Sequence, residues 1–194
     1  LGKTLESLRE EVSEREKAQD KLKHFNAVLR AVRNINQLIT KEKDRGRLLE
    51  GACENIVKAE GYRCAWVALF DDSRNLVAGA QAGLGGDFGR LLDMLSSGGS
   101  VPCVRKAMSD KRLVVIENPA ESCKECPLSG RHPGSGALAL RLEHGGKIWG
   151  VLTASVPVSF VKDKEEQSLF KELVEDLAFA LHDIEMTDKK RRAE

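Results

Sequence analysis

No stretch of the 194-residue chain is apolar for the length of a membrane-spanning helix, and no signal peptide precedes the first helical pattern. The 31 Lys and Arg residues almost balance the 30 Asp and Glu residues, so the net charge is only +1. This balance argues against nucleic acid or an anionic membrane as the main partner. The five cysteines are odd in number and widely spread, unlike a secreted disulfide framework. These absences favour a cytoplasmic location.

Recognisable catalytic motifs are also missing. Gly2-Lys3-Thr4 lacks the upstream glycine of a phosphate-binding loop, and in "GLGGDFG" (83–89) Phe88 stands where a dinucleotide-binding motif needs glycine. No serine-hydrolase, zinc-protease, kinase or cyclase signature occurs. The four histidines are scattered, and His24 and His182 lie on predicted helices. We therefore expect no catalytic residue in this chain, and any enzymatic output to belong to another part of a larger protein.

The N-terminal region, residues 1–40, has the pattern of a long helix. Leu1, Leu5, Leu8 and Val12 are spaced by four and three residues, as in the seam of a coiled coil. Arg15 and Gln19 take the next seam positions. An apolar stripe then resumes in a shifted phase, which indicates a stutter, through Ala18, Leu22, Phe25, Leu29, Val32, Ile35 and Ile39. We predict a parallel dimeric coiled coil; the alternative is an amphipathic helix folded onto its own domain from residue 18.

The C-terminal region, residues 163–194, mirrors this helix. One apolar stripe runs through Leu169, Phe170, Leu173, Val174, Leu177, Leu181 and Ile184. Two long helices at opposite ends of one domain predict a relay, with a signal arriving through one and leaving through the other. Because the chain begins at Leu1 rather than methionine, we expect it to be a piece of a longer protein, which a membrane segment elsewhere could anchor.

The middle region, residues 41–162, has the pattern of a compact domain. We predict helices at 47–60, 88–95 and 101–108, and strands at 62–70, 76–83 and 112–116. Gly145-Gly146 lies between two alternating runs, "GALALRLEH" and "KIWGVLTASV", which indicates a tight hairpin. This order predicts an α+β fold, with an antiparallel sheet and helices packed on one face.

Three stretches resemble a GAF domain, the small-molecule-sensing module of bacterial and archaeal signalling proteins. They are "GYRCAWVALFDDSRNLVAGAQAG", "GALALRLEHGGKIWGVLTASVPVSF" and "EEQSLFKELVEDLAFALHDIE", and the resemblance spans about residues 40–186. It is most similar to GAF units that follow a PAS domain and precede a histidine kinase, as in two-component systems, or a diguanylate cyclase. The resemblance implies terminal helices on one face of the sheet, a roofed ligand pocket on the other, and a homodimer joined through the terminal helices.

Cysteines and their neighbours are the candidate ligand-binding residues. Cys64 and Trp66 alternate along the predicted strand at 62–70, and three further cysteines fall in the segment that the resemblance places as a roof over the pocket. The predicted ligand-binding set is Cys64, Trp66, Cys103, Cys123, Cys126 and Arg131. The pattern identifies neither the ligand nor a cofactor.

The motif Cys123-x-x-Cys126 leaves three interpretations open. It could supply two thiolates to zinc, an iron–sulfur cluster or haem iron, although no second such pair completes a metal site. It could form a redox switch near a positive charge such as Lys124. Its thiols could instead simply pack within a loop.

A special form of the redox interpretation comes from the resemblance. Free methionine-R-sulfoxide reductases are GAF proteins with cysteines in the same roof; Cys103 resembles their resolving cysteine and Cys126 their nucleophile. Pro127 stands where those enzymes have aspartate, and Gly134-Ser135-Gly136 replaces their acidic residue before the next strand. Our main prediction is a regulatory sensor that binds a small molecule and signals to a downstream kinase or cyclase domain; the alternatives are a reductase of this kind or a metal-based redox sensor.

Overall fold

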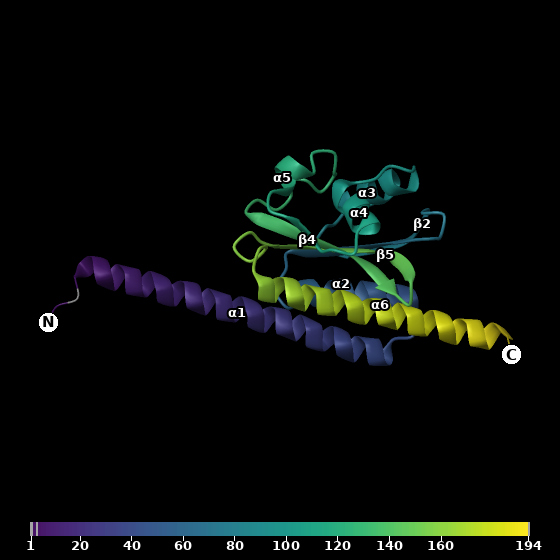
Figure 1. The fold of residues 1–194 in the computed structure, drawn as a ribbon, viewed down its shortest axis with the longest axis horizontal. Helices are drawn as coiled ribbons and strands as arrows, with labels where there is room; N and C mark the ends of the chain where they lie inside the picture. Colours follow the sequence, from purple (N-terminus) through teal and green to yellow (C-terminus); the bar gives the residue numbers. More distant parts are fainter. Residues whose placement is uncertain (1, 3, 194) are drawn as a thin grey trace.

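The computed structural model describes residue 2 and residues 4–193; Leu1, Lys3 and Glu194, which the sequence analysis included, lie outside the described residues. A central sheet separates two layers of helices (Figure 1). In chain order the elements are α1 (Leu5–Lys41), α2 (Arg45–Lys58), β1 (Cys64–Phe70), β2 (Leu76–Ala82), α3 (Asp87–Ser96), α4 (Pro102–Ser109), β3 (Val114–Ile116), α5 (Pro119–Ser122), β4 (Ser135–His144), β5 (Lys147–Pro157) and α6 (Lys164–Ala193).

The sheet is antiparallel throughout and has the strand order β2-β1-β5-β4-β3. The long helices α1, α2 and α6 lie on one side of it, and the short helices α3, α4 and α5 lie on the other (Figure 1). This arrangement confirms the predicted α+β class with long helices at both ends. Within the described residues, no helix is long and apolar enough to cross a membrane.

Glycines fix the central hairpin between β4 and β5. Gly145 and Gly146 both have positive φ angles, 57° and 79°, which suit glycine far better than other residues. Further along β5, a side chain at Gly150 would lie 2.0 Å from the carbonyl oxygen of Ala68 on the neighbouring strand β1. The pairing of β1 with β5 therefore depends on a glycine at this position.

Two hydrophobic clusters fill the space on the two sides of the sheet. The larger lies between the sheet and the long helices and includes fully buried Leu48, Leu152 and Phe170. The smaller lies between the opposite face and the short helices, and includes Trp66 and Leu91. Burial on both faces explains the almost continuous apolar sequence of β1.

Helix α1 has two separate apolar faces rather than one stripe with a stutter. From residue 24 onward, its buried residues pack on the domain: His24, Phe25, Ala27, Val28, Ala31, Val32 and Ile35. Leu22 and Leu29 are 63% and 50% exposed, and they continue the three-and-four spacing of Leu5, Leu8 and Val12 without interruption. The interpretation of a stutter was therefore wrong, because it joined residues of two faces into one stripe. The exposed face defines the α1 seam: Leu5, Leu8, Val12, Arg15, Gln19, Leu22, Asn26 and Leu29.

Candidate functional site

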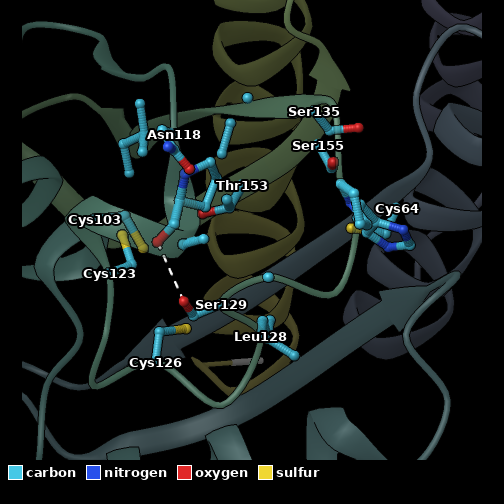
Figure 2. Close-up of a pocket in the computed structure, with 18 of the residues that line it drawn as sticks. Cys64, Cys103, Asn118, Cys123, Cys126, Leu128, Ser129, Ser135, Thr153 and Ser155 are labelled. Carbon is cyan, nitrogen blue, oxygen red and sulfur yellow. Dashed lines mark hydrogen bonds between the residues drawn. The ribbon is translucent and has the colours of Figure 1, made fainter.

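A cavity of about 110 Å³ lies between the sheet and the segment that covers its short-helix side. Its floor comes from β1, β4 and β5, and its roof from the start of α4, from α5 and from the loop at 123–134 (Figure 2). The strand register aligns the floor residues in rows. Cys64 of β1 is level with Ser155 of β5, and Trp66 is level with Thr153. All four side chains line the cavity, as the two-residue period of a strand requires.

The roof contributes the other three cysteines that line the cavity. Cys103 lies in the first turn of α4, and Cys123 directly follows α5. The backbone N–H of Cys126 donates to the carbonyl of Cys123 over 2.8 Å, so the C-x-x-C motif forms a tight turn. Figure 2 shows Cys103 and Cys123 gathered at one end of the cavity and Cys64 at the other.

Burial keeps these thiols protonated at neutral pH. It raises the pKa of Cys64 to about 11 and that of Cys103 to about 12. Burial also raises the pKa of Cys123 and of Cys126, even though Lys106 acts on Cys123 in the opposite direction. A redox-active cysteine normally needs a lowered pKa, because the thiolate is the nucleophile. The arrangement therefore disfavours spontaneous thiol chemistry at this site.

Arg131 is the one member of the predicted set that is not among the residues lining the cavity. Its guanidinium pairs with the carboxylate of Asp87 at the start of α3. The other five, Cys64, Trp66, Cys103, Cys123 and Cys126, all line the cavity, although their role in binding stays a prediction.

The described residues contain no group of three or more Cys, His, Asp or Glu side chains placed to hold a metal ion. In Figure 2, Cys64 lies at the opposite end of the cavity from Cys103 and Cys123.

The predicted set omits the six uncharged polar side chains that line the cavity: Asn118, Ser129, His132, Ser135, Thr153 and Ser155. The Nε2 atom of His132, Oγ of Ser135 and Oγ1 of Thr153 are buried, with no hydrogen-bond partner among the described residues. Thr153 could have been found from the sequence, because Thr153 and Ser155 alternate with Leu152 and Ala154 in an otherwise apolar strand. For His132 the sequence offers only its nearness to Cys123 and Cys126, because the roof loop has no periodic pattern that places its side chain in the cavity.

A second polar group lies on the opposite side of the sheet, where α1 crosses α6. His24 Nε2 and Glu166 Oε2 share a hydrogen bond of 2.6 Å, with side chains only 6% and 0% exposed. The His24 ring stacks on Phe160 with centroids 3.9 Å apart. The buried Tyr62 lies beside the pair; desolvation, and then the nearby Glu166 carboxylate, raise its pKa well above the usual value. We call these residues (His24, Glu166, Phe160 and Tyr62) the α1–α6 junction.

An ion pair at the edge of the junction reinforces it. Lys21 Nζ of α1 lies 3.1 Å from Asp163 Oδ2, directly before α6. Asp163 also caps α6 by accepting from the backbone N–H groups of Glu165 and Glu166. Burial acts to raise the pKa of Asp163, but Lys21 and these N–H groups outweigh it and the pKa is lowered. Asp163 therefore both caps α6 and ties the start of that helix to α1.

Comparison with known proteins places this architecture in a family. The sequence profile of the GAF domain matches residues 42–182. No curated protein matches the sequence.

Three solved structures with a similar fold have sequence identities of 15–18% with this chain. The GAF domain of an Acinetobacter phosphoenolpyruvate-protein phosphotransferase is 18% identical with a TM-score of 0.60, over 81% of this chain and 94% of that one. The corresponding domain from Coxiella burnetii is 15% identical with a TM-score of 0.60, over 86% and 98%. Free methionine-R-sulfoxide reductase from Neisseria meningitidis, solved with its substrate, is 16% identical with a TM-score of 0.54, over 82% and 91%. At this identity the likeness concerns the fold alone.

Proposed function

The chain belongs to the GAF domain family, and from that premise we propose that it is a regulatory sensing module of a signal-transduction protein. Its cavity takes up a small molecule, and its terminal helices carry the resulting change to another domain. The observation that carries this proposal is that the strands flooring the cavity also support the terminal helices on their other face. A ligand can shift such an equilibrium only by its different affinity for two states of the protein.

Strand β5 connects the two faces. Thr153 faces the cavity, whereas its neighbours Leu152 and Ala154 lie in the cluster packed against the long helices. Because a strand is stiff and its neighbours are close-packed, a displacement of the cavity floor also displaces the opposite face. The ligand is thus sensed through the sheet rather than through a flexible linker.

Helix α6 is held at two points, which suits it to receive this displacement. Near its start, Glu166 bonds to His24 of α1 at 2.6 Å. Nineteen residues later, Glu185 accepts from Lys147 Nζ of β5 at 2.8 Å, and Lys147 lies over the Trp149 ring at 4.0 Å. A movement of β5 therefore reaches α6 directly, and reaches α1 through the α1–α6 junction.

We further propose that the chain forms a parallel homodimer through its terminal helices, within a protein whose output is a histidine kinase or diguanylate cyclase. The α1 seam supports the dimer, because exposed Leu5, Leu8, Leu22 and Leu29 follow one heptad phase. Asn26 occupies a seam position near the C-terminal end of the seam, and an asparagine in a coiled-coil seam favours two strands in one register. In a dimer of this kind, a change at the junction alters the relation between two paired helices.

We propose no catalytic role for the module itself. The raised pKa values of the cavity thiols support this view, as does the lack of a charged side chain among the described residues that line the cavity. A reductase acting on a free amino acid needs groups that pair with the charges of that substrate. The likeness to the Neisseria meningitidis enzyme is a likeness of fold.

The experiment that tests the sensing proposal imitates an occupied cavity. Ala137 of β4 lines the cavity beside Ser155, so Ala137→Leu places extra apolar volume inside it. The matched control is Val77→Leu on β2, a half-exposed site outside the cavity. We expect hydrogen–deuterium exchange to change at 20–30 and 164–170, around the junction, for Ala137→Leu only. A change confined to the roof at 84–134 would count against the proposal.

A further inference from the structure

The cavity holds unsatisfied hydrogen-bonding capacity from three parts of the chain. Ser135 Oγ on β4 and Thr153 Oγ1 on β5 belong to side chains that are 5% and 6% exposed, and neither atom has a partner among the described residues. His132 Nε2 in the roof is likewise buried and has no partner among the described residues. Leaving such groups unpaired is costly, so they point to a bound molecule that hydrogen-bonds to them.

The cavity also lacks formal charge. None of the described residues that line it is Asp, Glu, Lys or Arg, and the adjacent Arg131 is paired with Asp87. Burial lowers the pKa of His132, with Arg131 and Arg63 acting in the same direction, so its ring is neutral at pH 7. The cavity thiols are neutral as well. An ion entering this site would lose its hydration without gaining a counter-charge.

The size of the cavity limits the ligand further. At about 110 Å³ it falls below the roughly 300–1,000 Å³ of sites for drug-sized ligands. An engineered cavity of about 150 Å³ in another protein binds benzene. The apolar part of the lining includes Trp66, Leu84 and Leu128, which suits a flat or compact hydrocarbon body.

Resting on the sensing function proposed above, we propose that the ligand is a small uncharged molecule of about the size of a benzene ring, with one hydroxyl, carbonyl or amide group. The polar group hydrogen-bonds to Thr153, Ser135 or His132, and the apolar body packs on Trp66 and the thiols. Nucleotides are too large for this cavity, and free amino acids are zwitterions. The cavity thus selects ligands that are uncharged and small.

Three probes of one ring size test the proposal: benzyl alcohol, benzoate and toluene. Binding to the whole chain is measured by titration in ¹H–¹⁵N correlation NMR at pH 7. We expect benzyl alcohol to bind at least tenfold more tightly than benzoate, because the anion is desolvated without a partner. We also expect it to bind more tightly than toluene, which lacks the polar group.

Thr153→Val provides the matched variant, because valine keeps the shape of threonine and removes the hydroxyl. We expect it to weaken the binding of benzyl alcohol about threefold to tenfold, the range of one net hydrogen bond, and to leave the affinity for toluene unchanged. Ser135→Ala is the second variant, so the test still stands if Thr153→Val fails to fold. Three results would overturn the proposal: benzoate binding as tightly as benzyl alcohol, no binding by any probe, or an affinity for benzyl alcohol that is unchanged in Thr153→Val, Ser135→Ala and His132→Phe alike.

The two proposals fail in different ways. If benzyl alcohol binds as expected but Ala137→Leu leaves the terminal helices unchanged, the ligand class holds and the sensing role fails. If Ala137→Leu alters hydrogen–deuterium exchange at the junction but benzyl alcohol binds no more tightly than benzoate, the sensing role holds and the ligand class is wrong.

Discussion

His24 and Glu166 are 142 residues apart in sequence and share a hydrogen bond of 2.6 Å in a nearly solvent-free site. Breaking a buried pair of this kind leaves one polar group uncompensated, whereas replacing both partners with apolar groups is often neutral. We expect His24→Phe and Glu166→Leu each to lower the free energy of unfolding by about 3–5 kcal/mol, and the double variant to recover most of the loss. Urea denaturation of the four proteins measures this cycle.

The control for this cycle is the exposed pair of Arg112 and Asp110. Arg112 Nη2 lies 2.7 Å from Asp110 Oδ2, with the arginine side chain 88% exposed. Arg112→Ala should leave the free energy of unfolding almost unchanged, because exposed ion pairs contribute little. If the losses for His24→Phe and Glu166→Leu simply add in the double variant, the two side chains do not act as a pair.

The buried thiols predict a dependence of stability on high pH. Folding raises the pKa of Cys64 to about 11 and of Cys103 to about 12, from an unfolded value of 9.0. The stabilisation is complete below pH 9 and is lost as the pH rises towards 11 and 12, because the unfolded chain ionises first. The raised pKa of Tyr62 acts in the same direction from about pH 10 upward. Thermal unfolding between pH 7 and 11 should show a falling midpoint above pH 9.

Cysteine alkylation gives an independent measurement of the same effect. At pH 7.5 iodoacetamide should modify all five thiols more slowly than it modifies free cysteine, with half-buried Cys126 the fastest and Cys53 the slowest. A thiol at the site that reacts faster than free cysteine at neutral pH would instead support the redox interpretation.

At the scale of elements, the α1 seam predicts a dimer that a single charge disrupts. We expect light scattering to give a mass near twice 21.4 kDa for the unchanged chain at tens of micromolar. Leu22→Glu should shift this mass towards the monomer, because it places a charge on each side of the seam. Leu22 is 63% exposed in the single chain, so its replacement should leave the fold intact by circular dichroism.

Lys17→Glu is the matched control, since Lys17 is exposed on the side of α1 opposite the seam. It should leave the mass unchanged. A monomer at these concentrations before any substitution would mean that the seam serves another contact.

Elements with a strong local signal were predictable from the sequence, and those defined by tertiary contacts were not. The turn at Gly145-Gly146 and the buried strand β1 follow from local chemistry, and both were found within a few residues of their bounds. The four-residue helix α5 was missed because so short a segment has no periodicity. The two faces of α1 were confused because the helix carries two overlapping apolar stripes, one packed on the domain and one exposed.

In the candidate site, too, residues with a local sequence pattern were predictable and residues placed by tertiary contacts were not. Cys64 and Trp66 were found because alternation along a strand fixes which side chains share a face. Arg131 was expected at the pocket from its place in the roof, but its partner Asp87 comes from α3, and sequence does not show such a pairing. The α1–α6 junction was invisible for the same reason.

At the scale of the whole molecule, signalling from the cavity to the terminal helices requires the two sides of the sheet to respond together. The chain contains two tryptophans, and they lie on opposite sides. Trp66 is on the cavity floor, and Trp149 packs in the cluster beneath the long helices, close to Lys147 and α6. Each is at most 4% exposed, so neither responds merely to solvent.

The most direct measurement is therefore ¹⁹F NMR of the chain labelled with 5-fluorotryptophan, during a titration with benzyl alcohol. Trp66→Phe assigns the two resonances. We expect both resonances to shift with the same midpoint, because the ligand at the floor displaces the strands that hold α6. A shift of the Trp66 resonance alone, with Trp149 unchanged at saturation, would contradict the claim that the cavity communicates with the terminal helices.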